Sequence, residues 1–143
     1  MAKNQVVFED IFLAPRAKIF SLFADHQRFG RVWGGVFVRI KPGDDPNEPN
    51  GFNSVRRIRS QGLTFEETIV TFRRNELIEY RVTKGSPIKN HLGHIEFSDA
   101  PGGGTHVRYS ISFDPRIPFT GKLIESALRG QWEKGKSRVM ELA

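Results

Sequence analysis

The sequence contains no cysteine in its 143 residues and only four histidines. The absence of cysteine excludes disulfide bonds, thiolate catalysis and zinc sites built on sulfur ligands. No stretch reaches the roughly 18 consecutive apolar residues of a transmembrane helix. The N-terminal residues also lack the apolar run of a signal peptide. From these absences we expect a cytoplasmic protein, and the sequence predicts neither a metal nor another cofactor.

The composition is that of one globular domain spanning residues 1–143. Hydrophobic residues make up 38% of the chain and charged residues 27%, which excludes intrinsic disorder. The formal net charge is +6, and this favours anionic partners. Twelve residues are phenylalanine, against two tyrosines and two tryptophans, and this excess favours a large apolar interior.

The hydrophobic pattern predicts a strand, two helices, six further strands and a long C-terminal helix. Proline at position 15 suits the first position of a helix, where its missing N–H costs nothing. Gln61-Gly62 and Arg74-Asn75 have the character of two-residue hairpin turns. An antiparallel sheet with helices on one face is an α+β architecture. The expected strands cover residues 5–13, 37–40, 52–60, 63–73, 76–83, 90–98 and 105–113, and the expected helices cover residues 14–24, 25–33 and 120–142.

The two predicted turns fix the strand register. The first pairs Arg56 with Glu67, and the second pairs Glu67 with Val82. The second turn also pairs Ile69 with Tyr80 and Thr71 with Ile78. Both hairpins therefore place Glu67 and its alternating neighbours on one apolar face, which we take as the concave one. Alternation in the last two strands adds His91, Ile95, Tyr109 and Ile111.

Polar groups on that concave face are the candidate site. Arg56 opposite Glu67 has two interpretations: a structural pair that closes one end of the core, or a polar anchor for a ligand. His91 is the best candidate for a general acid or base, with Glu67 as the second candidate catalytic residue. Tyr80 and Tyr109 are either core aromatics with hydrogen-bonded hydroxyls or part of the same site.

Three other signals carry less weight. His91 and His94 have an H-x-x-H spacing, but on a strand the odd offset sends them to opposite faces, so no metal site is expected. The three glycines at 102–104 precede a strand and not a helix, which favours a hairpin loop over a phosphate-binding loop. The basic groups at 56–59, 73–74 and 134–138 lack a recognition helix, so we expect no nucleic-acid binding. A solvated basic surface, or weak association with anionic membrane surfaces, fits them.

Seven parts of the sequence carry a family resemblance: residues 14–25 (APRAKIFSLFAD), Trp33, 51–58 (GFNSVRRI), 77–82 (LIEYRV), 85–88 (GSPI), 91–95 (HLGHI) and 104–109 (GTHVRY). They resemble the START-like superfamily, whose members have the helix-grip fold. The chain is most similar to small bacterial proteins of the polyketide cyclase/dehydrase type, and the superfamily also includes the birch-pollen allergen family and lipid-transfer domains. The resemblance implies a curved sheet of about seven strands wrapped around the C-terminal helix, with a ligand cavity between them.

We therefore predict a protein that binds a hydrophobic small molecule, such as a lipid, quinone, sterol or polyketide-like compound. One alternative is a cyclase or dehydratase in which Arg56 or Tyr80 polarises a carbonyl and His91 or Glu67 moves a proton. Another is a protein-interaction module whose core the phenylalanines fill. By analogy with the superfamily, the mouth would be formed by Trp33 and the loops at 42–51 and 86–89. The predicted ligand-binding residues are Arg56, Phe65, Glu67, Ile69, Tyr80, Val82, His91, Ile95, Tyr109, Ile111, Leu123, Leu128 and Trp132. The sequence does not determine the ligand's identity or the oligomeric state.

Overall fold

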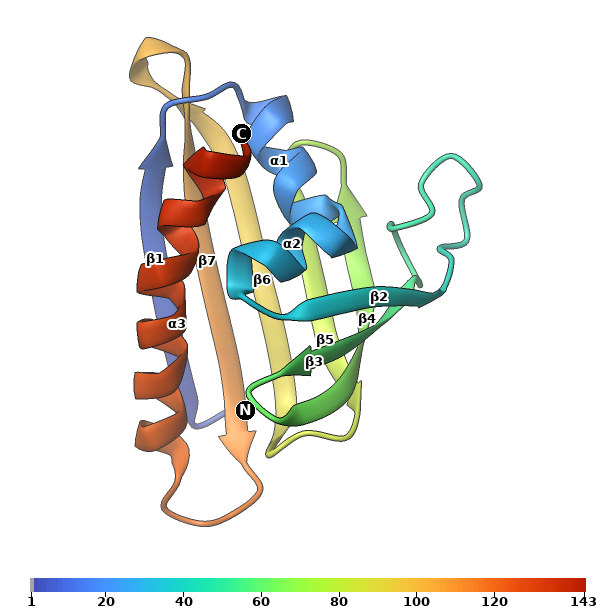
Figure 1. Ribbon diagram of the computed structural model, residues 1–143, viewed down its shortest axis with the longest axis vertical. Coiled ribbons are helices and arrows are strands. Elements are labelled where there is room, and N and C mark those ends of the chain that lie inside the picture. The colour runs from blue at the N-terminus through green and yellow to red at the C-terminus, as the bar shows by residue number, and fades with distance from the viewer. Residues whose placement is uncertain (1) are drawn as a thin grey trace.

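The computed structural model describes residues 2–143. Its seven strands form one antiparallel sheet in the order β1-β7-β6-β5-β4-β3-β2. In Figure 1 the sheet curves, α3 runs along its β1–β7 side, and α1 and α2 cover the same face. This confirms the predicted α+β helix-grip fold. The elements are β1 (Asn4–Phe12), α1 (Arg16–Ala24), α2 (His26–Trp33), β2 (Val36–Lys41), β3 (Val55–Ser60), β4 (Leu63–Arg73), β5 (Leu77–Lys84), β6 (Ile88–Ala100), the 3-10 turn η1 (Pro101–Gly103), β7 (Gly104–Pro115) and α3 (Gly121–Leu142).

The β3–β4 hairpin has the predicted register. Gln61 and Gly62 both have positive φ, 53° and 76°, as a tight two-residue turn requires. Arg56 pairs with Glu67 and Ile58 with Phe65. The turn therefore fixes which side chains of both strands face the helices.

The β4–β5 hairpin differs from its prediction near the turn. Glu67 pairs with Val82 and Ile69 with Tyr80, as expected, but Thr71 pairs with Glu79 and not with Ile78. The connection contains three residues, 74–76, with Asn75 at φ 64°. A bulge between Ile69 and Thr71 absorbs the extra residue, so the pairing from Ile69 to Glu67 is as predicted, and the register shifts once more between Glu67 and Glu66. The start of α1 also differs, because Pro15 is an extended N-cap and not the first helical residue.

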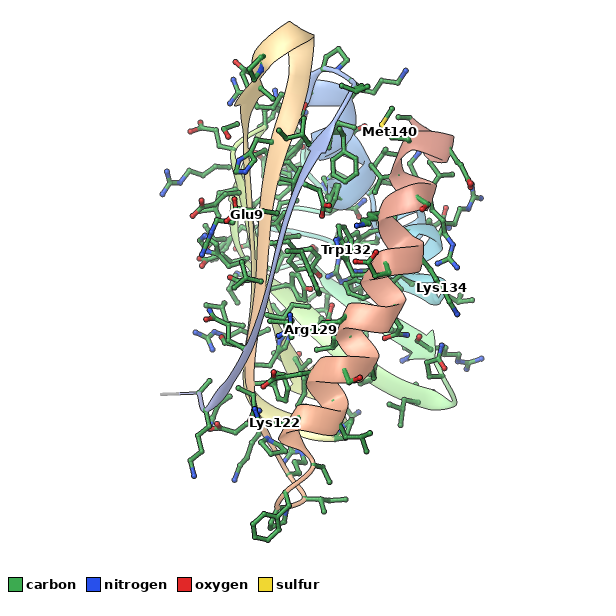
Figure 2. All side chains as sticks on the ribbon, turned by 90° about the vertical axis from the view of Figure 1, so that its left-hand side faces the viewer. Glu9, Lys122, Arg129, Trp132, Lys134 and Met140 are labelled. Atoms are coloured by element: carbon green, nitrogen blue, oxygen red, sulfur yellow. The ribbon has the colours of Figure 1, made fainter. Side chains whose placement is uncertain are left out.

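Aromatic side chains fill the core where the three helices meet the sheet. Trp132 of α3 stacks on Phe8 of β1, with ring centroids 5.4 Å apart, and its Nε1 donates to Asp10 Oδ2 at 2.9 Å. Figure 2 shows Trp132 on the side of α3 that faces the sheet and Lys134 on the outer side. These contacts hold α3 against β1. Within residues 2–143, no helix is long and apolar enough to cross a membrane.

Candidate functional site

A cavity of about 250 Å³ lies between the sheet and the N-terminal half of α3. Apolar side chains predominate in its lining, which is drawn from α2, every strand except β1, the β3–β4 turn, the β5–β6 loop and α3. The lining residues are Phe29, Trp33, Phe37, Ile58, Ser60, Gln61, Leu63, Phe65, Glu67, Tyr80, Val82, Ser86, Pro87, Ile88, His91, Ile111, Ile124, Ala127, Leu128 and Gln131.

The residues predicted to bind the ligand fall into three groups in the structure. One group lines the cavity, a second is buried outside the lining, and Leu123 is 72% exposed. Leu123 faces away because the helix side that meets the cavity carries Ile124 and its partners at positions 127, 128 and 131. The lining group is Phe65, Glu67, Tyr80, Val82, His91, Ile111 and Leu128; the buried group is Arg56, Ile69, Ile95, Tyr109 and Trp132.

Only some of the segments expected at the mouth line the cavity. Trp33 and residues 86–88 line the cavity, whereas Lys89 and the loop at 42–51 do not. Part of that loop, residues 48–50, borders a separate hollow against α1. In Figure 1 the loop extends beyond the C-terminal end of β2 and the N-terminal end of β3.

Helix α2 contributes residues that were not among the predicted ligand contacts. The Asp25 side chain caps the helix by accepting from the Arg28 backbone N–H at 3.0 Å. From this start, His26, Phe29 and Trp33 follow at i, i+3 and i+7, so they lie on one face of the helix. Phe29 and Trp33 line the cavity, and His26 is buried beside it. This spacing is the signal that would have identified them.

Arg56 and Glu67 form a buried ion pair through a single carboxylate oxygen. Arg56 Nε and Nη2 both donate to Glu67 Oε1, at 2.9 and 2.7 Å. The guanidinium carbon lies 5.2 Å from the ring centres of both Phe29 and Phe37 and 4.7 Å from that of Tyr80. Arg56 is 1% exposed and absent from the lining. Of the pair, therefore, only Glu67 reaches the cavity.

His26 completes the surroundings of the Arg56 guanidinium. Its Nδ1 lies 3.4 Å from Arg56 Nη1, and its Nε2 lies 3.2 Å from Ser54 Oγ. Burial, followed by the charges of Arg56 and Arg39, lowers the pKa of His26 to about 2. The ring is therefore neutral at physiological pH, so Nδ1 accepts from the guanidinium while Nε2–H donates to Ser54.

Glu67 retains one oxygen for another partner. Burial raises the pKa of its carboxyl group, and the charge and hydrogen bonds of Arg56 oppose that rise. Within residues 2–143, no group bonds to Oε2, and every fully buried side-chain oxygen and nitrogen there has a partner. Oε2 is therefore not fully buried, and it can accept a hydrogen bond from a molecule in the cavity.

His91 presents a donor to the same cavity. The backbone N–H of Val82 donates to His91 Nδ1 at 2.9 Å, which leaves the ring proton on Nε2. Burial, followed by the charges of Arg56 and Arg81, lowers the pKa of His91 to about 3. The ring is therefore neutral at physiological pH. In the described part of the chain Nε2 has no partner, so its N–H is free to bond a ligand.

Tyr80 and Tyr109 hydrogen bond to each other through their hydroxyl groups. Burial raises the pKa of both phenols, so neither ionises at physiological pH. Tyr80 pairs across the strands with Gly93, and its ring occupies the space that a Cβ at Gly93 would fill. Gly93 thus allows the Tyr80 ring to lie flat over β6 and form one wall of the cavity.

His94 lies on the opposite face of the sheet from His91. Its two ring nitrogens each lie 2.7 Å from a carboxylate oxygen, one of Glu79 and one of Glu96. Hydrogen bonds to these two carboxylates raise the pKa of His94 despite partial burial. The two histidines of the H-x-x-H spacing therefore do not converge on one point.

The comparisons with known proteins agree with this architecture. A model of the family described as polyketide cyclase / dehydrase and lipid transport matches residues 6–140. No match was found among curated proteins. A START superfamily protein from Mycobacterium smegmatis superimposes with a TM-score of 0.76 at 12% identity, covering 96% of this chain and 94% of that one. Protein MLL2253 from Mesorhizobium loti superimposes with a TM-score of 0.73 at 12% identity, covering 96% of this chain and 95% of that one. Ara h 8.0201 superimposes with a TM-score of 0.68 at 12% identity, covering 96% of this chain and 97% of that one.

At these identities the solved structures show the fold alone, and the family match covers almost the whole chain. Family and fold together suggest a protein that binds a hydrophobic ligand or resembles a polyketide cyclase. The chain belongs to the polyketide cyclase / dehydrase and lipid transport family.

Proposed function

We propose that this protein binds a small, uncharged and largely apolar molecule with one hydroxyl group in the cavity beside α3. The observation that carries the proposal is the pairing of an acceptor, Glu67 Oε2, with a donor, His91 Nε2–H, in an otherwise apolar lining. A hydroxyl group can donate to the first and accept from the second. Few polar groups in an apolar pocket are the usual means of orienting such a ligand.

The cavity volume supports a small ligand. A cavity of about 150 Å³ accommodates benzene, so about 250 Å³ suits a compound of roughly two fused rings. The volume is just below the range of typical small-molecule pockets, which span about 300–1,000 Å³. Among the ligand classes predicted from the sequence, a quinone-sized or aromatic polyketide-like compound fits this volume better than a sterol or a two-chain lipid. The open volume also argues against a fully filled core.

Titration with 2-naphthol, followed by calorimetry, tests this proposal. We expect binding to the parent protein and a loss of at least about tenfold in Leu128→Trp, whose larger ring occupies the cavity. Leu123→Trp is the matched control, because it makes the same change five residues earlier, on the exposed side of the same helix, and should bind as the parent does. Glu67→Gln should weaken binding by about tenfold, because it replaces a charged acceptor by a neutral one. Absence of heat with the parent, or equal affinity in Leu128→Trp, would contradict the proposal.

Native and denaturing mass spectrometry of the purified protein provides a complementary measurement. A non-covalent mass that is released on unfolding would identify the chemistry of a resident ligand. A species near the size of a two-ring aromatic compound would support the proposal, and a four-ring or two-chain compound would contradict the size argument.

A second candidate function is proton transfer within the same cavity. The observation that favours it is Glu67, a carboxylate whose pKa is raised by burial and which lines the cavity. Its Oε2 could remove a proton next to a carbonyl while His91 Nε2–H stabilises the oxygen that gains charge. His91 itself is a poor base, because its Nδ1 is occupied by the Val82 N–H, and Arg56 does not line the cavity.

Deuterium exchange at the carbon atoms beside the carbonyl of 2-tetralone, followed by NMR, tests this second function. Faster exchange with the parent than with Glu67→Gln would support proton transfer. Exchange at the buffer rate, together with measurable binding of 2-tetralone, would restrict the function to binding.

A further inference from the structure

The connection between β7 and α3, together with the first turn of α3, carries a group of exposed apolar side chains that the fold does not use. We call Ile117, Phe119 and Leu123 the apolar tip; their side chains are 64%, 103% and 72% exposed. Phe119 has a φ of 68°, in the left-handed region that disfavours residues other than glycine. A fully exposed aromatic ring on such a backbone adds nothing to the packing of residues 2–143. Its position is therefore better explained by a partner outside the chain.

The chain segments at the same end of the molecule as the apolar tip are rich in basic side chains. The segments at this end, residues 84–90 and 114–123, contain four exposed cations, Lys84, Lys89, Arg116 and Lys122, and a single carboxylate. That carboxylate, Asp114, accepts hydrogen bonds from the Lys3 backbone N–H at 2.6 Å and from Asn90 Nδ2 at 2.7 Å. Figure 2 shows Lys122 at the end of α3 where the connection enters it. This end of the molecule thus combines exposed apolar side chains with an excess of positive charge.

The apolar tip is fixed to a loop that lines the cavity. The Arg116 backbone N–H donates to Pro87 O, and Arg116 Nε donates to Ser86 O, both at 2.9 Å. Ser86 and Pro87 line the cavity, and their loop lies at the same end of the molecule as the tip (Figure 1). A third hydrogen bond, from Thr120 Oγ1 to Ile117 O at 2.7 Å, holds the connection in shape. A surface that binds the tip therefore lies next to the cavity.

We propose that the apolar tip docks on the surface of an anionic lipid bilayer. Phe119 and Ile117 enter the interface between headgroups and acyl chains, while the lysines at this end and Arg116 contact the lipid phosphates and carboxylates. An apolar tip at a lysine-rich end of the molecule fits a charged bilayer better than a protein partner, since lysine is depleted in protein–protein interfaces. This docking goes beyond the proposed ligand binding and does not depend on it.

Sedimentation with lipid vesicles tests this proposal. The parent should bind vesicles of equimolar phosphatidylserine and phosphatidylcholine, bind pure phosphatidylcholine at least about tenfold more weakly, and lose affinity as salt is added. Phe119→Gly should reduce partitioning by about tenfold or more, because the aromatic side chain is removed. Lys122→Gln should reduce it by about fivefold. Phe52→Ala, which removes another exposed phenylalanine from the β2–β3 loop, is the matched control and should bind like the parent.

The glycine variant separates docking from folding and from ligand binding. Glycine tolerates a positive φ, so Phe119→Gly should melt no lower than the parent and should bind 2-naphthol with unchanged affinity. The proposal is overturned when the parent does not sediment with anionic vesicles, or when Phe119→Gly binds them as well as the parent. It is also overturned when Phe119→Gly abolishes a dimer seen by analytical ultracentrifugation, because a second copy of the chain would then occupy the tip.

Discussion

Acidification from about pH 7.5 to about pH 5 is expected to destabilise this protein through two buried histidines. His26 and His91 are 2% and 5% exposed, and their folded-state pKa values lie at about 2 and about 3, below the ordinary value of 6.5. As the pH falls below 6.5, the unfolded chain binds a proton at each ring and the folded chain does not. The unfolded state is therefore favoured progressively from about pH 6.5 down to each folded pKa.

The size of the effect follows from this proton uptake. Within that pH range, each histidine removes about 1.4 kcal/mol from the free energy of unfolding for every pH unit. Between about pH 7.5 and pH 5, the loss is about 2 kcal/mol for each ring, or about 4 kcal/mol for both. Stabilities of small domains are only about 5–15 kcal/mol, so the change is large enough to measure.

Urea denaturation followed by circular dichroism at the two pH values measures this loss. His91→Asn keeps an acceptor near the position of Nδ1 for the Val82 N–H and removes the titrating ring, so its loss should be about 2 kcal/mol smaller than that of the parent. Val82→Ala is a control that changes the cavity wall without changing a titratable group, and its loss should equal that of the parent. An equal loss in His91→Asn and the parent would refute the reasoning, because His91 would then have an ordinary pKa in the folded state.

His94 on the outer face acts in the opposite direction. Its pKa is raised by Glu79 and Glu96, so its contribution to stability is fully present below pH 6.5 and is lost as the pH rises through its folded pKa. The contribution of His94 is the same in the parent and in His91→Asn. The difference between them therefore reports on His91.

Two further predictions concern the walls of the cavity. Gly93→Ala should displace the Tyr80 ring, lowering the melting temperature and weakening 2-naphthol binding, whereas Gly130→Ala, at a helix position with open space around it, should lower neither quantity. Arg56→Met should cost about 3–5 kcal/mol in urea denaturation because it leaves Glu67 buried without its partner. The double variant Arg56→Met/Glu67→Leu should recover most of that stability yet still bind 2-naphthol weakly, and a double variant as unstable as Arg56→Met would contradict the assignment of the pair.

The strand register of the sheet could be predicted from the sequence only where the conformation of the turn could be predicted. Gln61-Gly62 is a short turn with a defined conformation, and it fixed the pairing of Arg56 with Glu67. Around Arg74-Asn75 the connection has three residues, and no local pattern reveals the compensating bulge near Val70. The strand faces remained correct beyond the bulge because the two irregularities cancel.

Strand alternation predicts which face a side chain occupies, and it does not predict depth along the strand. Ile69 and Ile95 share the concave face with Glu67 and His91, but both are fully buried in the core and lie outside the cavity lining. The depth depends on how far each helix extends over the sheet, which is a tertiary property. On α3 the sequence does not determine how the helix is rotated about its own axis. Consecutive helical residues are about 100° apart, so Leu123 is exposed whereas its neighbour Ile124 lines the cavity.

The Arg56–Glu67 pair had a structural and a ligand-binding interpretation, and each of them applies to a different oxygen of Glu67. Oε1 of Glu67 belongs to the structure, because it accepts both bonds from a guanidinium held by three aromatic rings and His26. Oε2 is left for the cavity. The contact between Arg56 and His26 joins residues 30 positions apart, so strand pairing alone could not show it.

Because Arg56 already compensates the carboxylate charge, a cationic ligand would gain little from Glu67 and would lose its hydration. The site therefore favours a neutral hydrogen-bond donor, and 2-naphthol should bind more tightly than the protonated 2-aminomethylnaphthalene.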